Sequence, residues 1–405
     1  MNAEVPRVII GRQPIYDRAM NVYAYELLFR AGTSNNIAEV TSENADFATS
    51  RVINHAFMEL GASRVIGEHI GFINLTRSFL LSDDPIPFTQ EKIVLEILED
   101  IEIDQPLLDA IQKLVAQGYT LALDDFVYNE QLAPLVKMAK IIKVDILDVD
   151  ADVLINHVQE LKKYSVRLLA EKIETREQFI LCKELGFELF QGFYFCRPTI
   201  IEDKPFPENH IKLFKIIERL QDPNVEFNEI EQLIVQEVAL SYKLLRLLNS
   251  AAMGLRHKVD SIQKGLVILG LKAIRTWTTM IALNSIGSVN PELMTNALVR
   301  AKMCESLAPN YGFSEQTGFL TGLFSNLDAM IGIPMDHLMT SMPLSGEIKL
   351  ALTEQGGPLG QMLERVVAYE QGRWDDINTQ EISLEDMSDS FVRATDWTIQ
   401  NQALI

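Results

Sequence analysis

Short apolar runs alternate with helix-like patterns through residues 1–204. The runs are strand-like in length and composition: RVIIG, NVYAYELLFR, GFINLT, KIVLEILE, TLALDDF, IIKVDIL, VRLLAEKI and FELFQGFYF. Between them, apolar residues recur at helical spacing over 42–60, 77–81, 105–117, 132–139, 150–163 and 176–185. Strands that alternate with helices form parallel sheets, and about eight of them close a barrel. We therefore predict a TIM-like (β/α)8 barrel.

The pattern changes after the charged stretch EDKPFP at residues 202–207. Its charges and two prolines interrupt any periodicity, so we predict a domain boundary there, with domains at 1–204 and 205–405. Beyond it, apolar residues recur every three or four positions, and helices are expected over 229–250, 261–269, 271–286, 292–307, 315–330, 346–355, 360–371 and 384–402. The second domain is predicted to be all-α.

Composition narrows the function classes. The chain has 36 basic and 56 acidic residues and a net charge of −20, which argues against a general nucleic-acid-binding surface but leaves room for a local pocket for one small anionic ligand. Cys182, Cys196 and Cys304 have no CxxC spacing, so neither a disulfide framework nor a zinc site is indicated. We expect no membrane span, because no apolar run approaches about 18 residues, and a cytoplasmic location.

Polar residues interrupt the apolar runs of the predicted barrel at corresponding places. They are Glu26, Asn74, Glu96, Asp124, Asp125, Lys143, Asp145, Glu171 and Gln191. The carboxyl ends of barrel strands meet at one face, where active sites form. A structural partner explains a single glutamate in an apolar strand, but a series at matching positions predicts one shared acidic pocket.

Asp124 and Asp125 stand side by side at the end of TLALDDF. Two carboxylates at short range raise each other's pKa, and a divalent cation removes that cost. A solvated turn is the alternative for an isolated Asp-Asp pair, and the recurrence of acids after other strands favours the cation.

These residues stand in ordered motifs that resemble the EAL domain, the barrel family that hydrolyses cyclic di-GMP. YELLFR at 25–30 is similar to the signature ExLxR, with Leu27 at the position of the alanine in the family's name. INLT, VLEILE, LALDDF and IIKVD follow in the family's order; AEKIET at 170–175 is similar to AEGVET and QGFYFCRP at 191–198 to QGxxFxxP. The second domain resembles HDOD, an HD-type domain without enzymatic activity, most clearly at KLLRLLNSAAMGLRHKVDSIQKGLVILG. Together they resemble the EAL-HDOD signalling proteins.

The resemblance implies two-metal hydrolysis of cyclic di-GMP to linear pGpG, with Mg²⁺ or Mn²⁺. It implies that one ion is held by Glu26, Asn74, Glu96 and Asp124, and that Asp125 and Glu171 lie at or near the second. Hard oxygen ligands suit both ions. Lys143, Glu171 and Asp125 are the implied catalytic residues, with Lys143 orienting or deprotonating the attacking water or stabilising the charged transition state. Glu174 would support the loop after Asp125, and Arg30, Gln191 and Asp145 would contact the substrate. Structural partners are the alternative for Arg30 and Gln191.

Two departures from the family pattern bear on turnover. Where the family has the Gly- and Ser-rich loop DDFGTGYSS, this chain has DDFVYNEQL, in which Val127 and Tyr128 replace residues that turn tightly. In the family that loop couples dimerisation to metal binding, so the altered loop makes weak or absent turnover the alternative to hydrolysis. A homodimer is among the expected assemblies. Lys172 stands at the glycine of AEGVET and adds bulk beside Glu171 and Glu174.

The helical half lacks the metal ligands of HD hydrolases, which use an adjacent His-Asp pair. The corresponding segment FLTGLFSNLDAMIG has Ser325 and Asn326, and His210, His257 and His337 are far apart in sequence. We expect a regulatory module that binds an unidentified protein partner, and no second active site.

Three functions follow from these observations. The leading one is a cyclic di-GMP phosphodiesterase-like signalling protein. The alternatives are a receptor that binds cyclic di-GMP without turnover and a scaffold that binds no nucleotide.

Overall fold

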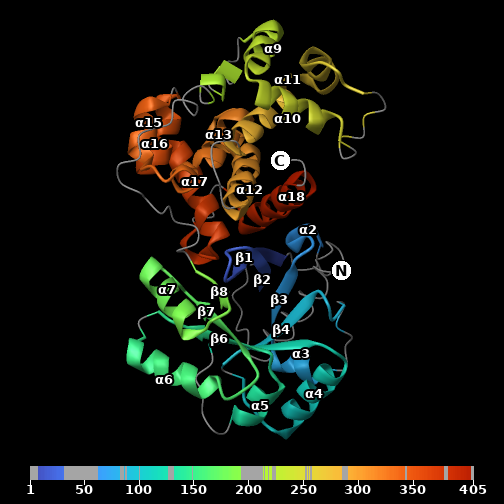
Figure 1. The fold of residues 1–405 in the computed structure, drawn as a ribbon, viewed down its shortest axis with the longest axis vertical. Helices are drawn as coiled ribbons and strands as arrows, with labels where there is room; N and C mark the ends of the chain where they lie inside the picture. The colour runs from blue at the N-terminus through green and yellow to red at the C-terminus, as the bar shows by residue number, and fades with distance from the viewer. Residues whose placement is uncertain are drawn as a thin grey trace, which may run out of the picture. The chain divides into compact units, whose positions relative to one another are not determined.

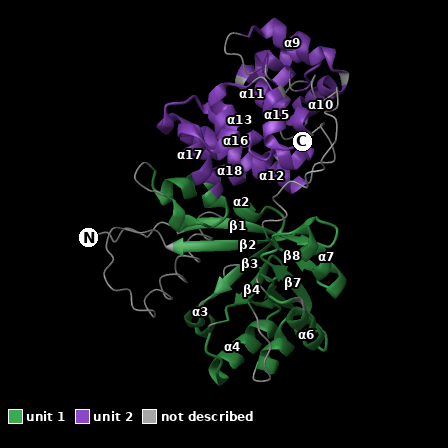
Figure 2. Cartoon of the chain, turned by 90° about the vertical axis from the view of Figure 1, so that its left-hand side faces the viewer, with its two compact units in different colours: residues 1–197, 368–392 green, residues 198–367, 393–405 purple. Residues whose placement is uncertain are grey.

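The chain folds into two compact units, Met1–Arg197 with Ala368–Val392, and Pro198–Val367 with Arg393–Ile405 (Figure 2). The computed structural model describes residues 8–31, 63–82, 86, 89–99, 101–125, 132–147, 149–192, 213, 215–217, 219–220, 225–250, 253, 255, 258–284, 291–342, 344–377 and 382–402. The predicted helix at 42–60, the loop at 126–130, the boundary stretch at 202–207, and His210 and His257 lie outside these ranges.

The first unit contains a closed eight-stranded barrel in sequence order, which confirms the predicted barrel (Figure 1). Its strands are β1 (Val8–Asp17), β2 (Val22–Ala31), β3 (Ile70–Leu75), β4 (Ile93–Ile97), β5 (Thr120–Leu123), β6 (Ile141–Asp145), β7 (Arg167–Glu171) and β8 (Leu189–Phe190). Strands β2 to β8 pair in parallel, whereas β1 is antiparallel to both β2 and β8. The amino-terminal end of β1 therefore lies beside the carboxyl end of β2.

Helices connect the parallel strands. They are α2 (Ser63–Ile66), α3 (Arg77–Leu81), α4 (Gln105–Ala116), α5 (Ala133–Met138), α6 (Ala151–Leu161) and α7 (Arg176–Leu185) (Figure 1). Local sequence sets where they begin: Asp104 accepts a hydrogen bond from the backbone N–H of Leu107, and Thr175 and Gln178 form a capping box at the start of α7. These connections return the chain to the same end of the barrel before each new strand.

A return of the chain completes the first unit. Residues Ala368–Val392 belong to it although they follow the helical domain in sequence. The Tyr369 hydroxyl donates to the carbonyl of Ile10 at 2.8 Å, and the backbone N–H of Ile10 donates to Ser388 Oγ at 3.1 Å. The Trp374 ring lies against Gly11, where a Cβ atom would stand 3.0 Å from the ring. This return was not part of the sequence prediction, which assigned residues 205–405 to the helical domain.

The second unit is helical, as predicted. Its helices lie within α9 (Phe227–Gln236), α10 (Val238–Leu248), α11 (Ile262–Asn284), α12 (Pro291–Leu307), η4 (Ala308–Tyr311), α13 (Glu315–Phe324), α14 (Leu327–Ile331), α15 (Met335–Ser341), α16 (Gly346–Glu354), α17 (Gly357–Glu370) and α18 (Leu384–Gln402), while η5 (Trp374–Asp376) belongs to the barrel unit. Helices α12 and α13 pack closely because α13 carries Gly318 and Gly322: a Cβ atom at either would stand within 2.4 Å of the α12 backbone.

Candidate active site

One layer of side chains inside the barrel positions the candidate site. The inner core consists of Ile15, Ala24, Phe72, Val94, Ala122, Ile141, Leu169 and Leu189. Side chains alternate along a strand, so the residue two positions further on faces the same interior. On β2 to β8 these residues are Glu26, Asn74, Glu96, Asp124, Lys143, Glu171 and Gln191. Seven of the nine predicted polar positions thus form the second interior layer, at the carboxyl ends of the parallel strands; the other two are Asp125 and Asp145.

Lys143 lies at the centre of this layer. Its Nζ is 2.7 Å from Asp124 Oδ1, 2.9 Å from Glu96 Oε1, 3.0 Å from Glu171 Oε1 and 3.4 Å from Glu26 Oε1. The lysine side chain is 1% exposed and that of Glu96 is fully buried. One ammonium group therefore faces four carboxyl groups, a surplus of negative charge in a site shielded from water.

This surplus changes the protonation of the cluster. Burial, together with Glu26 and Asp124, raises the pKa of Glu96 to about 8, although Lys143 opposes the shift. Burial also raises the pKa of Glu171 well above its usual range. Burial alone would lower the pKa of Lys143, but the four surrounding carboxylates raise it. The site therefore holds a charged lysine, and Glu96 and Glu171 retain their protons more readily than exposed glutamates do.

Gln191 ties the antiparallel strand β1 to the acidic layer. Its Nε2 donates to Glu26 Oε2 at 2.7 Å and to Gln13 Oε1 at 3.0 Å. The position of Gln191 is fixed by the backbone, because its N–H donates to Ala170 and its carbonyl accepts from the N–H of Ile173. Gln13 was missed at the sequence level. Gln13 could have been found only from the strand register, because it stands opposite Glu26 when β1 is antiparallel to β2.

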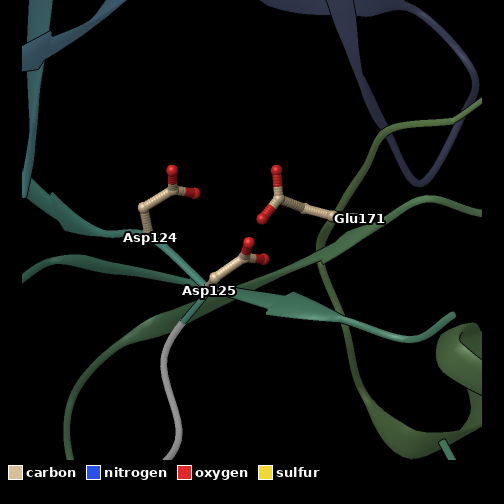
Figure 3. A group of neighbouring side chains, drawn as sticks. All are labelled: Asp124, Asp125 and Glu171. Atoms are coloured by element: carbon tan, nitrogen blue, oxygen red, sulfur yellow. The ribbon is translucent and has the colours of Figure 1, made fainter. Parts of the chain in front are cut away.

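The cluster fits a hard divalent cation. In the part of the chain that the structure describes, Asn74 Oδ1, Glu96 Oε2 and Glu171 Oε2 are buried and accept no hydrogen bond. Carboxylate and amide oxygens left without donors are the ligands that Mg²⁺ and Mn²⁺ prefer. Asp124, Asp125 and Glu171 each offer one oxygen, and these lie within 4.8 Å of one another (Figure 3). Their convergence from two strand ends gives a second set of candidate ligands that shares Asp124 and Glu171 with the inner cluster.

Asp125 and Asp145 lie at the rim of this layer. Asp125 has a φ of 42°, a left-handed conformation that turns its side chain toward Asp124 and Glu171 (Figure 3). Asp145 stands opposite Glu171 in the β6–β7 register. Its Oδ2 is 2.5 Å from Lys172 Nζ, and its Oδ1 accepts the N–H of Leu147.

Two predicted residues stand outside the acidic layer. Arg30, four residues after Glu26 on β2, forms an ion pair with Asp375 at 2.7 Å, so the returning segment holds it. Glu174 is half-buried, and its backbone N–H donates to Gln178 Oε1. The loop that Glu174 was predicted to support lies outside the described residues, so that role remains a prediction.

The helical unit shows a different arrangement at the position of the HD pair. Arg300 donates to Asn326 Oδ1 at 2.5 Å and to Ser325 Oγ at 3.2 Å, and both Arg300 and Asn326 are buried. Within the described residues of this unit, histidine, cysteine and acidic side chains form no cluster with metal-ligand spacing.

Family models match the amino-terminal and the carboxyl-terminal part of the chain separately. An EAL-domain family model matches residues 8–198, and an HDOD-domain model matches residues 206–344. The cyclic di-GMP phosphodiesterase CdgJ of Vibrio cholerae is 33% identical over 405 residues, covering 98% of this chain and 93% of that protein. The uncharacterized protein YuxH of Bacillus subtilis is 30% identical, covering 96% and 98%. Among solved structures, the manganese and cyclic di-GMP complex of Klebsiella pneumoniae BlrP1 matches with a TM-score of 0.39 and 21% identity, covering 48% of this chain and 56% of that one.

A barrel with an acidic interior layer, followed by a helical domain whose described residues form no HD-type metal cluster, is the architecture of a two-domain signalling family. This chain belongs to the EAL-HDOD family, as the resemblance of its motifs indicated. In the described residues no single helix is both long and apolar enough to span a membrane, and one bent pair, Ile262–Leu271 with Ala273–Leu283, meets the length and composition criteria together.

Proposed function

We propose that the protein is a metal-dependent cyclic di-GMP phosphodiesterase with a helical regulatory domain. The observation that carries this proposal is the interior layer itself, in which Glu26, Asn74, Glu96, Asp124 and Glu171 converge around Lys143. The relative CdgJ, which is similar over nearly the whole chain, supports the choice of substrate.

Each of these residues has a proposed role in metal binding, catalysis or positioning. Glu26, Asn74, Glu96 and Asp124 would hold the inner cation, with Asp125 and Glu171 beside it. A bound Mg²⁺ or Mn²⁺ supplies charge neutralisation for the phosphate and polarises the attacking water. Lys143 orients that water and stabilises the negative charge that develops on the phosphate, since its ammonium is charged and in contact with the acidic layer. Gln191 holds Glu26 in place through its 2.7 Å hydrogen bond.

A receptor that binds cyclic di-GMP without turnover is the second candidate. The loop sequence VYNE at 127–130 and the contacts of Lys172 with Asp145 and Asp125 favour it. In either case we propose a cytoplasmic protein whose helical domain binds a protein partner, with a homodimer among the assemblies to be tested.

The test is incubation of the purified chain with cyclic di-GMP and Mg²⁺ or Mn²⁺, followed by chromatography for pGpG. The phosphodiesterase predicts pGpG in the presence of metal, none in EDTA, and none with Glu26→Ala. Binding without product would identify the receptor, and absence of both binding and product would contradict both candidates.

Removal of Asp375 is expected to strengthen nucleotide binding. The Arg30–Asp375 pair is largely exposed, with Asp375 85% exposed, so releasing Arg30 gains at most about 1 kcal/mol, or roughly fivefold in Kd. Calorimetric titration of Asp375→Ala with cyclic di-GMP measures the change. Asp376→Ala, which removes the neighbouring pair with Arg373, is the matched control and should bind like the parent protein. Equal affinities for all three would show that Arg30 does not contact the nucleotide.

Metal affinity is expected to rise with pH. A cation must displace the proton that Glu96 carries below its pKa of about 8, so affinity increases as pH approaches that value and levels off above it. Between pH 6 and pH 8 the increase should be roughly tenfold or more. Titration with Mn²⁺, followed by the paramagnetic signal of the free ion, measures it. A flat profile would mean that Glu96 is ionised throughout this range.

A further inference from the structure

Lys172 directly follows the candidate metal ligand Glu171 and has an unusual backbone. Its φ is 54°, in the left-handed region that favours glycine. A lysine held there carries a conformational cost of about 1 kcal/mol or more. Its side chain is half exposed, so burial of apolar surface does not offset that cost. The contacts of its ammonium group offset this conformational cost instead.

The ammonium lies between two carboxylates of the rim. Lys172 Nζ is 2.5 Å from Asp145 Oδ2 and 3.8 Å from Asp125 Oδ2. A lysine ammonium is charged at neutral pH, and contact with carboxylates favours its charged form. The chain itself thus supplies a positive charge beside Asp125.

The same carboxylates border the second set of candidate cation ligands. Asp125 belongs to the group with Asp124 and Glu171 whose oxygens lie within 4.8 Å of one another. Asp145 stands opposite Glu171 in the sheet register. A divalent ion bound through Asp125 would lie next to the Lys172 ammonium, and two cations at that range repel. Lys172 is tethered and already paired, whereas an ion must come from solution.

We propose that the Lys172 ammonium takes the place of the second divalent cation, so that the site binds one ion, at the inner cluster. This inference rests on the proposed metal-dependent function and deepens it. Lys172 is a positioning residue: it neutralises Asp125 and Asp145 and limits the site to a single ion. Within the described residues Lys172 forms ion pairs with Asp125 and Asp145 and none with the inner ligand Glu96, and the inner ligands keep their ion.

Counting Mn²⁺ ions on the full chain by paramagnetic resonance tests the proposal. Two Mn²⁺ ions held about 4 Å apart are magnetically coupled, which separates a paired site from ions scattered on the acidic surface. The parent protein is expected to bind one isolated ion at the site. Lys172→Gly and Lys172→Met should each bind a coupled pair, with the second ion at least tenfold tighter than any second ion in the parent protein.

The variants control for one another. Lys172→Gly suits the left-handed backbone and should fold at least as well as the parent chain. Lys172→Met keeps the length of the side chain without its charge, and Lys172→Arg keeps the charge and should still bind one ion. Lys140→Met removes an exposed lysine that precedes β6 and should also bind one. A coupled pair in the parent protein, or a single ion in both uncharged variants, overturns the proposal. Absence of any bound ion in the parent protein would overturn the proposed metal-dependent function as well. That result differs from the two above, which overturn only the single-ion proposal.

Discussion

Replacing Glu96 by glutamine is expected to abolish hydrolysis of cyclic di-GMP without unfolding the protein. Glu96 is fully buried; its Oε1 pairs with the Lys143 ammonium at 2.9 Å, and its Oε2 accepts no hydrogen bond in the described structure. Glutamine preserves the shape but removes the charge that binds the cation. The ion supplies several kcal/mol of charge stabilisation, so we expect a loss of roughly 10³-fold or more in kcat/KM.

The thermal stability of Glu96→Gln should not fall with its activity. A carboxyl group whose pKa is raised from 4.5 to about 8 on folding destabilises the native state progressively as pH rises between these values. Glu96→Gln removes that penalty, so without metal at pH 8 its melting temperature should equal or exceed that of the parent protein. Glu188→Gln, at the opposite end of the strands, is the matched control and should retain full activity. Hydrolysis by Glu96→Gln at near-parental rates would exclude Glu96 as a ligand.

Replacing Lys143 by methionine is expected to destabilise the metal-free barrel strongly. Lys143 is the ammonium group that faces Glu26, Glu96, Asp124 and Glu171, and removing one partner of a buried ion pair costs about 3–5 kcal/mol. For a domain of this size the melting temperature should fall by roughly 6–20 °C in EDTA. Thermal unfolding followed by circular dichroism measures the change.

The dependence on pH and on metal of the fall in melting temperature of Lys143→Met shows whether the charge of Lys143 is its cause. Without Lys143 the carboxyl groups keep their protons to higher pH, so the loss should be larger at pH 8 than at pH 6. Millimolar Mn²⁺ should restore much of the stability, because the ion supplies the missing positive charge. Lys140→Met removes a nearby exposed lysine and should leave the melting temperature unchanged within about 1–2 °C. A loss independent of pH and metal would mean that Lys143 contributes packing and not charge.

The acidic layer could be predicted from the sequence because two simple rules define it: the alternation of side chains along a strand and the parallel arrangement of the strands. Alternation along strands puts Glu26, Asn74 and Glu96 on the interior side, and the parallel sheet brings the carboxyl ends of the strands together. The same rule places Asp124, Lys143, Glu171 and Gln191. These residues could be assembled without coordinates because each follows an apolar interior residue by two positions.

The contacts made by segments distant in sequence were not accessible in this way. Nothing in the sequence near Asp375 indicates that it pairs with Arg30, 345 positions earlier, and Trp374 contacts Gly11 only because the chain returns to the barrel. Gln13 was overlooked because the sheet was predicted to be parallel, whereas the short turn after Asp17 makes β1 antiparallel to β2. Lys172 was noted for its bulk, whereas its ion pair with Asp145 depends on the neighbouring strand.

The most direct test of the account is to locate Mn²⁺ in crystals of the full chain by anomalous scattering. The account predicts a peak at bonding distance, about 2.0–2.3 Å, from oxygens of Glu26, Asn74, Glu96 and Asp124. A protein saturated with Mn²⁺ that shows no ion among these side chains, or an ion bound only elsewhere, would contradict the convergence of these residues into a cation site and the hydrolysis built on it.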